Sequence, residues 1–159
     1  MSANNLLGDF AFFPDSALWL RSDIGITPGV GSGVASWAGV GGGPVVSQAT
    51  AGMQPVFNAS DAVFDGLPSL AFASASTQYM FAANTPLYTN TGYSYVVVST
   101  RSVSGGAGVV FGVGEPANGS VIGFQAIPQL SITAPNCGTF LYDGSPPINT
   151  ASIIVVTQG

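Results

Sequence analysis

The chain contains no histidine and no lysine, and only one cysteine, one glutamate and two arginines. Proton transfer and nucleophilic attack near neutral pH depend mainly on histidine, lysine, cysteine and paired carboxylates, whose pKa values can be tuned to that range. Without histidine there is no Ser-His-Asp triad, and Cys137 lacks the base that would activate its thiol. We therefore predict that the protein is not an enzyme.

The same shortages restrict metal binding. A zinc site draws its ligands mainly from cysteine and histidine, which one cysteine cannot supply. Calcium needs several oxygen ligands, usually with more than one carboxylate among them. The available aspartates are scattered along the chain, at Asp15, Asp23, Asp61, Asp65 and Asp143. We expect no cofactor, and the minority alternative is calcium held by loop aspartates that the fold brings together.

Positive charge is also scarce, since two arginines face seven acidic residues and the formal net charge is −5. Arg21 and Arg101 cannot neutralise a phosphate backbone, and they form no basic patch for anionic lipid. No apolar run approaches the ~20 residues of a membrane-spanning helix. Residues 1–10 lack the basic and apolar regions of a signal peptide. We expect neither nucleic acid nor a membrane as a partner.

The sequence is rich in residues that interrupt helices, with 22 glycines and 11 prolines. Between them lie short β-branched and aromatic runs, which are typical of strands. We predict strands at residues 17–21, 34–37, 55–57, 69–73, 78–81, 93–101, 108–113, 121–125, 130–133, 139–142 and 152–157. Short runs separated by turn residues indicate an antiparallel sandwich or barrel.

Local patterns refine this prediction. Asp65-Gly66 and Asp143-Gly144 are typical of tight turns, because both positions tolerate a positive φ. Residues 93–101 carry apolar side chains on both faces, which predicts a central strand. The glycine-rich residues 29–33 are similar to a phosphate-binding loop, but they lack a lysine and a following helix, so we interpret them as an ordinary loop.

An ordered set of motifs runs through the first half of the chain: ALWL at 17–20, VASW at 34–37, SQAT at 47–50, QPVF at 54–57, GLPSLAF at 66–72 and QYM at 78–80. This order resembles the LamG-like, concanavalin A-like jelly-roll domains of bacterial surface proteins and bacteriophage virions. The motifs cover residues 17–101, and the remainder is similar only in the rhythm of its strands. The resemblance implies an all-β, two-layer antiparallel jelly-roll sandwich formed by one domain over residues 1–159, with an N-terminal arm at 1–16.

Large aromatic residues recur along the predicted strands, at Trp19, Trp37, Phe57, Phe72 and Tyr79. We predict that these rings pack between the two sheets, where each would bury a large apolar area. Stacking of Trp37 or Tyr79 on a sugar is the alternative.

The sequence differs from the enzymes that share this fold in its carboxylates, and from related domains in its last residues. Glucanases with this fold place their carboxylates on one strand in a pattern like E-x-D-x-x-E, whereas the single Glu115 lies in a predicted turn. Related domains end with a hairpin, but residues 157–159 begin a turn with no returning strand. We expect a sandwich that either lacks its last strand or is completed by a neighbouring chain, because an open edge promotes aggregation.

The composition and the resemblance together predict a non-enzymatic structural protein of a bacteriophage virion surface. It would be a capsid decoration or tail-associated module that acts through contacts with other virion proteins or with copies of itself, after synthesis in the host cytoplasm. The alternative is a carbohydrate-binding module that attaches to host-surface glycans. Its candidate ligand-binding residues are Asn90, Tyr93, Asn136 and Asp143.

Overall fold

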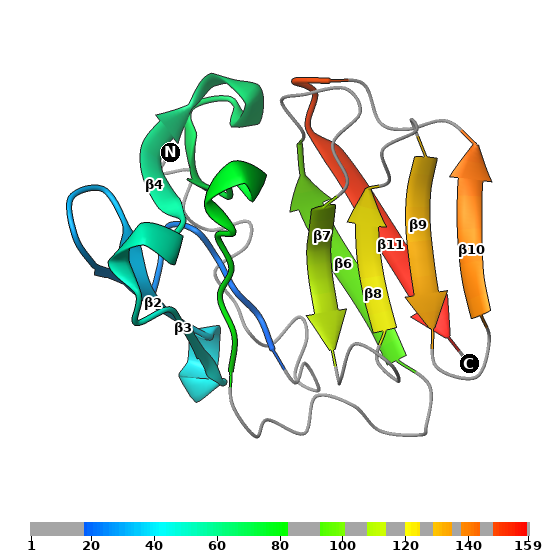
Figure 1. Ribbon diagram of the computed structural model, residues 1–159, viewed down its shortest axis with the longest axis horizontal. Helices are drawn as coiled ribbons and strands as arrows, with labels where there is room; N and C mark the ends of the chain where they lie inside the picture. Colours follow the sequence, from blue (N-terminus) through cyan, green and yellow to red (C-terminus); the bar gives the residue numbers. More distant parts are fainter. Residues whose placement is uncertain are drawn as a thin grey trace, which may run out of the picture. The chain divides into compact units, whose positions relative to one another are not determined.

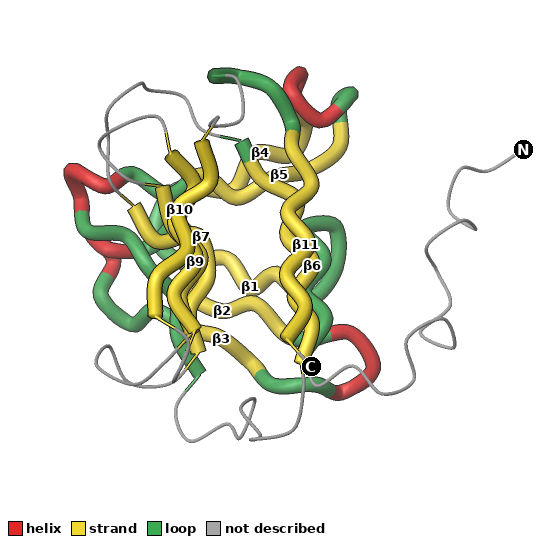
Figure 2. Tube along the Cα trace, turned by 90° about the vertical axis from the view of Figure 1, so that its right-hand side faces the viewer, coloured by secondary structure: helices red, strands yellow, loops and turns green. Residues whose placement is uncertain are grey.

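The computed structural model describes residues 18–82, 93–100, 108–113, 120–124, 129–134, 138–143 and 148–158. These residues form antiparallel sheets and no α-helix, so the prediction of an all-β protein is confirmed. Their helical segments are short 3-10 turns between strands (Figure 2). The chain forms two compact units, Met1–Thr85 and Pro86–Gly159, which carry the strands shown in Figure 1. That the whole chain is one domain stays a prediction.

A three-stranded antiparallel sheet opens the first unit, in the order β1 (Ile26–Pro28), β2 (Val34–Ala38) and β3 (Val45–Ser47). The glycine-rich loop at 29–33 joins β1 to β2. It closes on itself, because the Gly29 N–H donates to the Gly33 carbonyl at 2.8 Å and the Gly33 N–H donates to the Val30 carbonyl at 3.0 Å. This loop therefore serves as a strand connection.

A hairpin of β4 (Val56–Asp61) and β5 (Leu67–Ala71) follows in the same unit. The 3-10 turn Ala62–Phe64 leads into Asp65 and Gly66, with φ values of 53° and 81°. The predicted Asp65-Gly66 turn is therefore confirmed.

The hairpin is joined to the three-stranded sheet by backbone hydrogen bonds. The Val34 N–H donates to the Pro55 carbonyl and the Phe57 N–H donates to the Ser32 carbonyl, both at 2.9 Å. The entry into β2 and the start of β4 therefore hold the first unit together.

The core of the first unit is small and mixed. Val34, Val46 and Pro55 are buried, and so are three polar residues, Gln48, Gln54 and Ser69. A core that buries polar side chains must provide hydrogen-bond partners for them. Long-range polar contacts therefore contribute to this unit alongside apolar packing.

The aromatic residues predicted for the core divide into two groups. Trp19, Trp37 and Phe57 are half-buried. For Phe72 and Tyr79 the prediction is wrong, since about half of each residue is exposed. Phe72 lies one residue beyond the end of β5, and Tyr79 lies outside any strand. Neither residue has the strand alternation that would turn its side chain inward.

The second unit contains a four-stranded antiparallel meander in the order β10-β9-β8-β7. Its strands are β7 (Gly108–Val113), β8 (Ser120–Phe124), β9 (Gln129–Ala134) and β10 (Gly138–Asp143). A separate ribbon pairs β6 (Tyr93–Ser99) with β11 (Ser152–Gln158), in a register that sets Val97 opposite Ile154. We expected a central strand here, but β6 has β11 as its one strand neighbour within the described ranges.

The predicted strands from residue 93 onward are confirmed to within two residues at each end, and so is the one at 34–37. The predictions at 55–57 and 69–73 overlap β4 and β5. The strand expected at 17–21 is not formed by residues 18–21. There the Trp19 carbonyl accepts from the Val40 N–H at 2.9 Å, and the Arg21 carbonyl accepts from the Trp37 ring N–H at 2.7 Å. Residues 18–21 therefore make single hydrogen bonds to Val40 and to the Trp37 side chain, and they do not pair with another strand.

Candidate functional site

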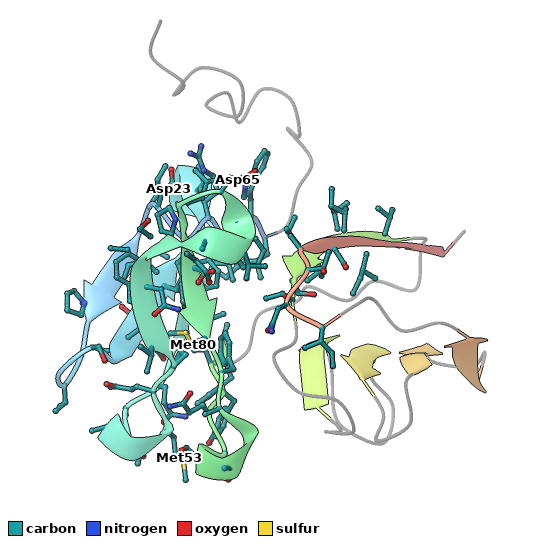
Figure 3. All side chains as sticks on the ribbon, turned by 90° about the horizontal axis from the view of Figure 1, so that it is seen from above. Asp23, Met53, Asp65 and Met80 are labelled. Atoms are coloured by element: carbon teal, nitrogen blue, oxygen red, sulfur yellow. The ribbon has the colours of Figure 1, made fainter. Side chains whose placement is uncertain are left out.

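The most distinctive surface feature of the first unit is an aromatic pair, Tyr79 and Phe81. Their exposed fractions are 46% and 52%, and the ring centroids lie 6.1 Å apart with a tilt of 35°. This spacing falls within the range of interacting aromatic rings. Met80, between them in sequence, is half-buried and lies within the unit in Figure 3.

Backbone hydrogen bonds fix the segment that carries the aromatic pair. The backbones of Ser47 and Phe81 exchange two hydrogen bonds, of 2.9 and 3.2 Å, so this segment lies antiparallel beside the end of β3. The Tyr79 N–H donates to the Met53 carbonyl at 3.3 Å, which ties the segment to the 3-10 turn Ala51–Met53. The strand predicted at 78–81 is therefore reduced to a single bridge at Phe81.

Two buried glutamines, Gln48 and Gln54, form an amide cluster next to this segment. They are 3% and 5% exposed. The Gln48 Nε2 donates to the Tyr79 carbonyl at 3.3 Å, and its Oε1 accepts from the Thr50 N–H at 3.0 Å. The Gln54 Nε2 donates to the Gln48 carbonyl at 2.9 Å, and its Oε1 accepts from the Val30 N–H at 3.2 Å.

Every polar side-chain atom of the amide cluster thus has a partner within the protein. The four bonds connect the loop at 29–33, residues 48–54 and the segment of the aromatic pair. Buried polar groups persist when they are satisfied in this way. The amide cluster is therefore a structural support that sets where Tyr79 lies.

A second polar group joins β4 to β5. The Ser69 Oγ donates to the Asp61 Oδ2 at 2.6 Å, and the Asn58 Nδ2 donates to the Ser69 Oγ at 3.3 Å. The other Asp61 oxygen, Oδ1, accepts from the Val63 N–H at 3.0 Å. Oδ1 therefore caps the 3-10 turn, and Oδ2 links β4 to Ser69 of β5. Both carboxylate oxygens stabilise the hairpin.

The described part of the chain contains no group of three or more His, Cys, Asp or Glu residues that could hold a metal ion. Of the aspartates considered for calcium, Asp15 lies outside the described residues. Asp23 is paired with Arg21, and Asp61 is bonded within the hairpin. No calcium site is assembled from the described aspartates.

Arg21 and Asp23 form a two-point ion pair at the surface. The Arg21 Nη2 lies 2.6 Å from the Asp23 Oδ2, and the Arg21 Nε donates to the Asp23 Oδ1 at 3.1 Å. The hydrogen bond from Arg21 lowers the pKa of the Asp23 carboxyl below its ordinary value of 3.8, against the opposing effect of partial burial. This pair fixes the chain just before β1.

Replacing Asp23 with asparagine should reduce the acid sensitivity of folding by a small amount. A carboxylate whose pKa is lowered on folding contributes stability above its unfolded pKa, and that contribution is lost as the pH falls through the folded value. The pair is solvent-exposed, so we expect less than about 1 kcal/mol. Urea unfolding at about pH 7 and pH 3 should show a smaller loss for Asp23→Asn than for the wild type. Equal losses would contradict the pairing.

The residues predicted to bind a glycan are only partly described. Asn90 and Asn136 lie outside the described residues. Tyr93 begins β6 of the ribbon and Asp143 ends β10 of the meander, so the two belong to different sheets. Gly144, the second residue of the turn predicted after Asp143, also lies outside the described residues. These four residues as a binding site stay a prediction.

Sequence reasoning missed the amide cluster and Phe81. A glutamine within SQAT and another before Pro55 were the available signals, because both lie in motifs of the resemblance. Their burial depends on partners up to 31 residues away along the chain, which no local pattern predicts.

Comparisons with known proteins give no relative. No family model matches the chain, and no curated protein or solved structure is significantly similar to it. Within the described ranges, no helix is long and apolar enough to cross a membrane. The function must therefore be inferred from the surfaces described above.

Proposed function

We propose that the chain is a non-enzymatic structural protein of a bacteriophage virion surface, a capsid decoration or tail-associated module with a jelly-roll sandwich fold. The observation that carries this proposal is the number of large apolar side chains on its surface. In the first unit these are Ile24, Val30, Val45, Leu67, Phe72, Tyr79 and Phe81. Contacts with other proteins would cover these apolar side chains, and exposed apolar patches are typical of such contacts.

The use of polar side chains supports the non-enzymatic part of the proposal. Asp61 and Ser69 brace a hairpin, and Gln48 and Gln54 connect loops. General acid–base catalysis needs a titratable group that can reach a substrate proton. In the first unit, the bonds of these side chains stabilise the fold.

The experiment that tests the proposal is purification of the tagged chain from cells infected by a phage that encodes it. We expect the chain to sediment with assembled capsids or tails and to resist removal at high salt, because apolar contacts are insensitive to screening. Recovery solely as a free monomer would contradict the proposal.

A second candidate function, binding of host-surface glycans, is favoured by the aromatic pair. Two exposed rings on one rigid segment can stack on the apolar face of a sugar, as the alternative role for Tyr79 requires. If this function holds, Tyr79→Ala should weaken binding to a glycan at least tenfold, which corresponds to about 1.4 kcal/mol.

The matched control is Phe72→Ala, which removes a similarly exposed ring outside the aromatic pair. Glycan-array binding should be retained by this variant. An array without hits for the wild type, or equal losses for both variants, would reject the glycan-binding candidate.

A further inference from the structure

The ribbon of β6 and β11 exposes an apolar surface, which we call the ribbon face: Val96, Val98, Ile153 and Val155. Their exposed fractions lie between 58% and 70%. The register sets Val98 opposite Ile153, and the next outward pair is Val96 with Val155, so these side chains are cross-strand neighbours. On the opposite face, Ile154 is buried and its cross-strand partner Val97 is half-buried. The ribbon therefore has one covered apolar face and one open apolar face.

Apolar residues on both faces are unusual for a ribbon that keeps one face in water. Antiparallel strands with one solvated face normally alternate apolar and polar residues, whereas the runs VVV in β6 and IIVV in β11 interrupt that alternation. A two-stranded ribbon is also only marginally stable in water on its own. Covering the ribbon face would stabilise the ribbon, because it removes four β-branched side chains from water.

The lack of charge on the ribbon points to a second copy of the chain as the occupant. The chain carries seven acidic residues and two arginines, so two copies repel each other wherever their carboxylates come close. Neither β6 nor β11 contains a charged residue, so two ribbon faces can meet without that repulsion. A two-fold interface brings the same patch of both copies together, and the patch must then be complementary to itself. An uncharged array of β-branched side chains meets this condition, because the hydrophobic effect is non-directional.

The area of the ribbon face fits a small interface between two copies. Four side chains exposed to this degree present about 400 Å² of apolar surface, which is the size of a functional patch on a protein. Homodimer interfaces are about 65% apolar, so an apolar centre of this size belongs to an interface of about 600 Å² per copy. Specific interfaces begin at about this size, near 600 Å² from each partner.

We propose that two copies of the chain associate through their ribbon faces, packed against each other across a two-fold axis. The two ribbons then lie about 10 Å apart, the distance at which the side chains of stacked sheets interdigitate. An interface of this size gives a weak dimer, with a dissociation constant in the micromolar range. This inference goes beyond the proposed function, because it holds whether or not the chain belongs to a virion.

Sedimentation equilibrium of the full chain tests the association. The wild type should change from monomer to dimer between about 1 and 100 μM. Val98→Glu places like charges in the interface and should weaken the dimer about tenfold or more. The matched control is Val30→Glu, which adds the same charge at a 71% exposed valine of the first unit and should leave the dimer unchanged. A wild type that stays monomeric, or equal losses for the two variants, would overturn the proposal, and the ribbon face would then have another occupant.

Mixing two variants separates loss of the contact from loss of folding. Val98→Glu and Val98→Lys should each weaken the dimer, but their mixture sets opposite charges across the interface. We expect the mixture to associate about tenfold or more tightly than either variant alone. A misfolded ribbon would not regain association in this way. Failure of the mixture to associate more tightly than the separate variants would refute the contact.

Discussion

Replacing Gln54 with leucine is expected to lower the free energy of unfolding by about 2–4 kcal/mol. The substitution keeps the size of the side chain but leaves the Val30 N–H and the Gln48 carbonyl without their amide partners. The bond to the Gln48 carbonyl is buried, so water cannot readily replace it. Denaturant unfolding monitored by tryptophan fluorescence would measure the loss.

The matched control for this prediction is Gln78→Leu. Gln78 also accepts a backbone hydrogen bond, from the Ala73 N–H at 2.7 Å, but that bond is solvent-exposed. Water can replace it, so we expect a loss below about 1 kcal/mol. Similar losses for the two variants would show that the amide cluster does not stabilise the first unit.

Replacing Gly25 with alanine should cost about 3–5 kcal/mol, through backbone strain and a clash. Gly25 has a φ of +75°, and an added Cβ would lie 2.5 Å from the carbonyl oxygen of Ala38. That oxygen belongs to β2, whose Ala38 N–H donates to the Gly25 carbonyl at 2.9 Å. The strand cannot move away without breaking this bond, which fixes the start of β1.

Gly31→Ala separates the two contributions. Gly31 has a similar φ of +62°, but no atom lies within 4 Å of its added Cβ. The substitution therefore adds backbone strain without a clash, and we expect a loss of about 1 kcal/mol. Thermal or urea unfolding measures the two losses in free energy of unfolding. Equal losses for Gly25→Ala and Gly31→Ala would contradict the close approach of Gly25 to β2.

The two halves of the fold differ in how well the sequence predicts them. The strands from β6 onward are five to seven residues long, rich in β-branched residues and bounded by turn residues, so local pattern identifies them. β1 and β3 have only three residues each and were missed. Such short strands exist because of their partners, and the identity of a partner is not a local property of the sequence.

The candidate site was less predictable for a related reason. Tyr79 was expected in the core, but hydrogen bonds to Gln48 and Met53 hold its segment outside the strands. Gln54 precedes Pro55, a position that favours extended backbone or a turn and predicts nothing about burial. Gln54 bonds to a backbone group 24 residues away and Gln48 to one 31 residues away, and only the folded chain brings these groups together.

The two units present different surfaces for assembly. The first unit exposes several apolar residues together with the aromatic pair, and the second exposes Val96, Val98, Ile153 and Val155 of the β6–β11 ribbon. Only 6% of the residues are charged, far below the ~25–35% suited to a soluble surface, so few charges oppose contact between copies. These features favour a protein that functions in contact with neighbouring proteins.

Quantitative mass spectrometry of purified virions tests the proposed structural role most directly. Peptides of the chain should occur at a fixed ratio to the major capsid or tail protein, and that ratio should be constant between preparations and after washing at high salt. A ratio that falls toward zero on purification, with the chain left behind as a soluble monomer, would contradict the proposed role.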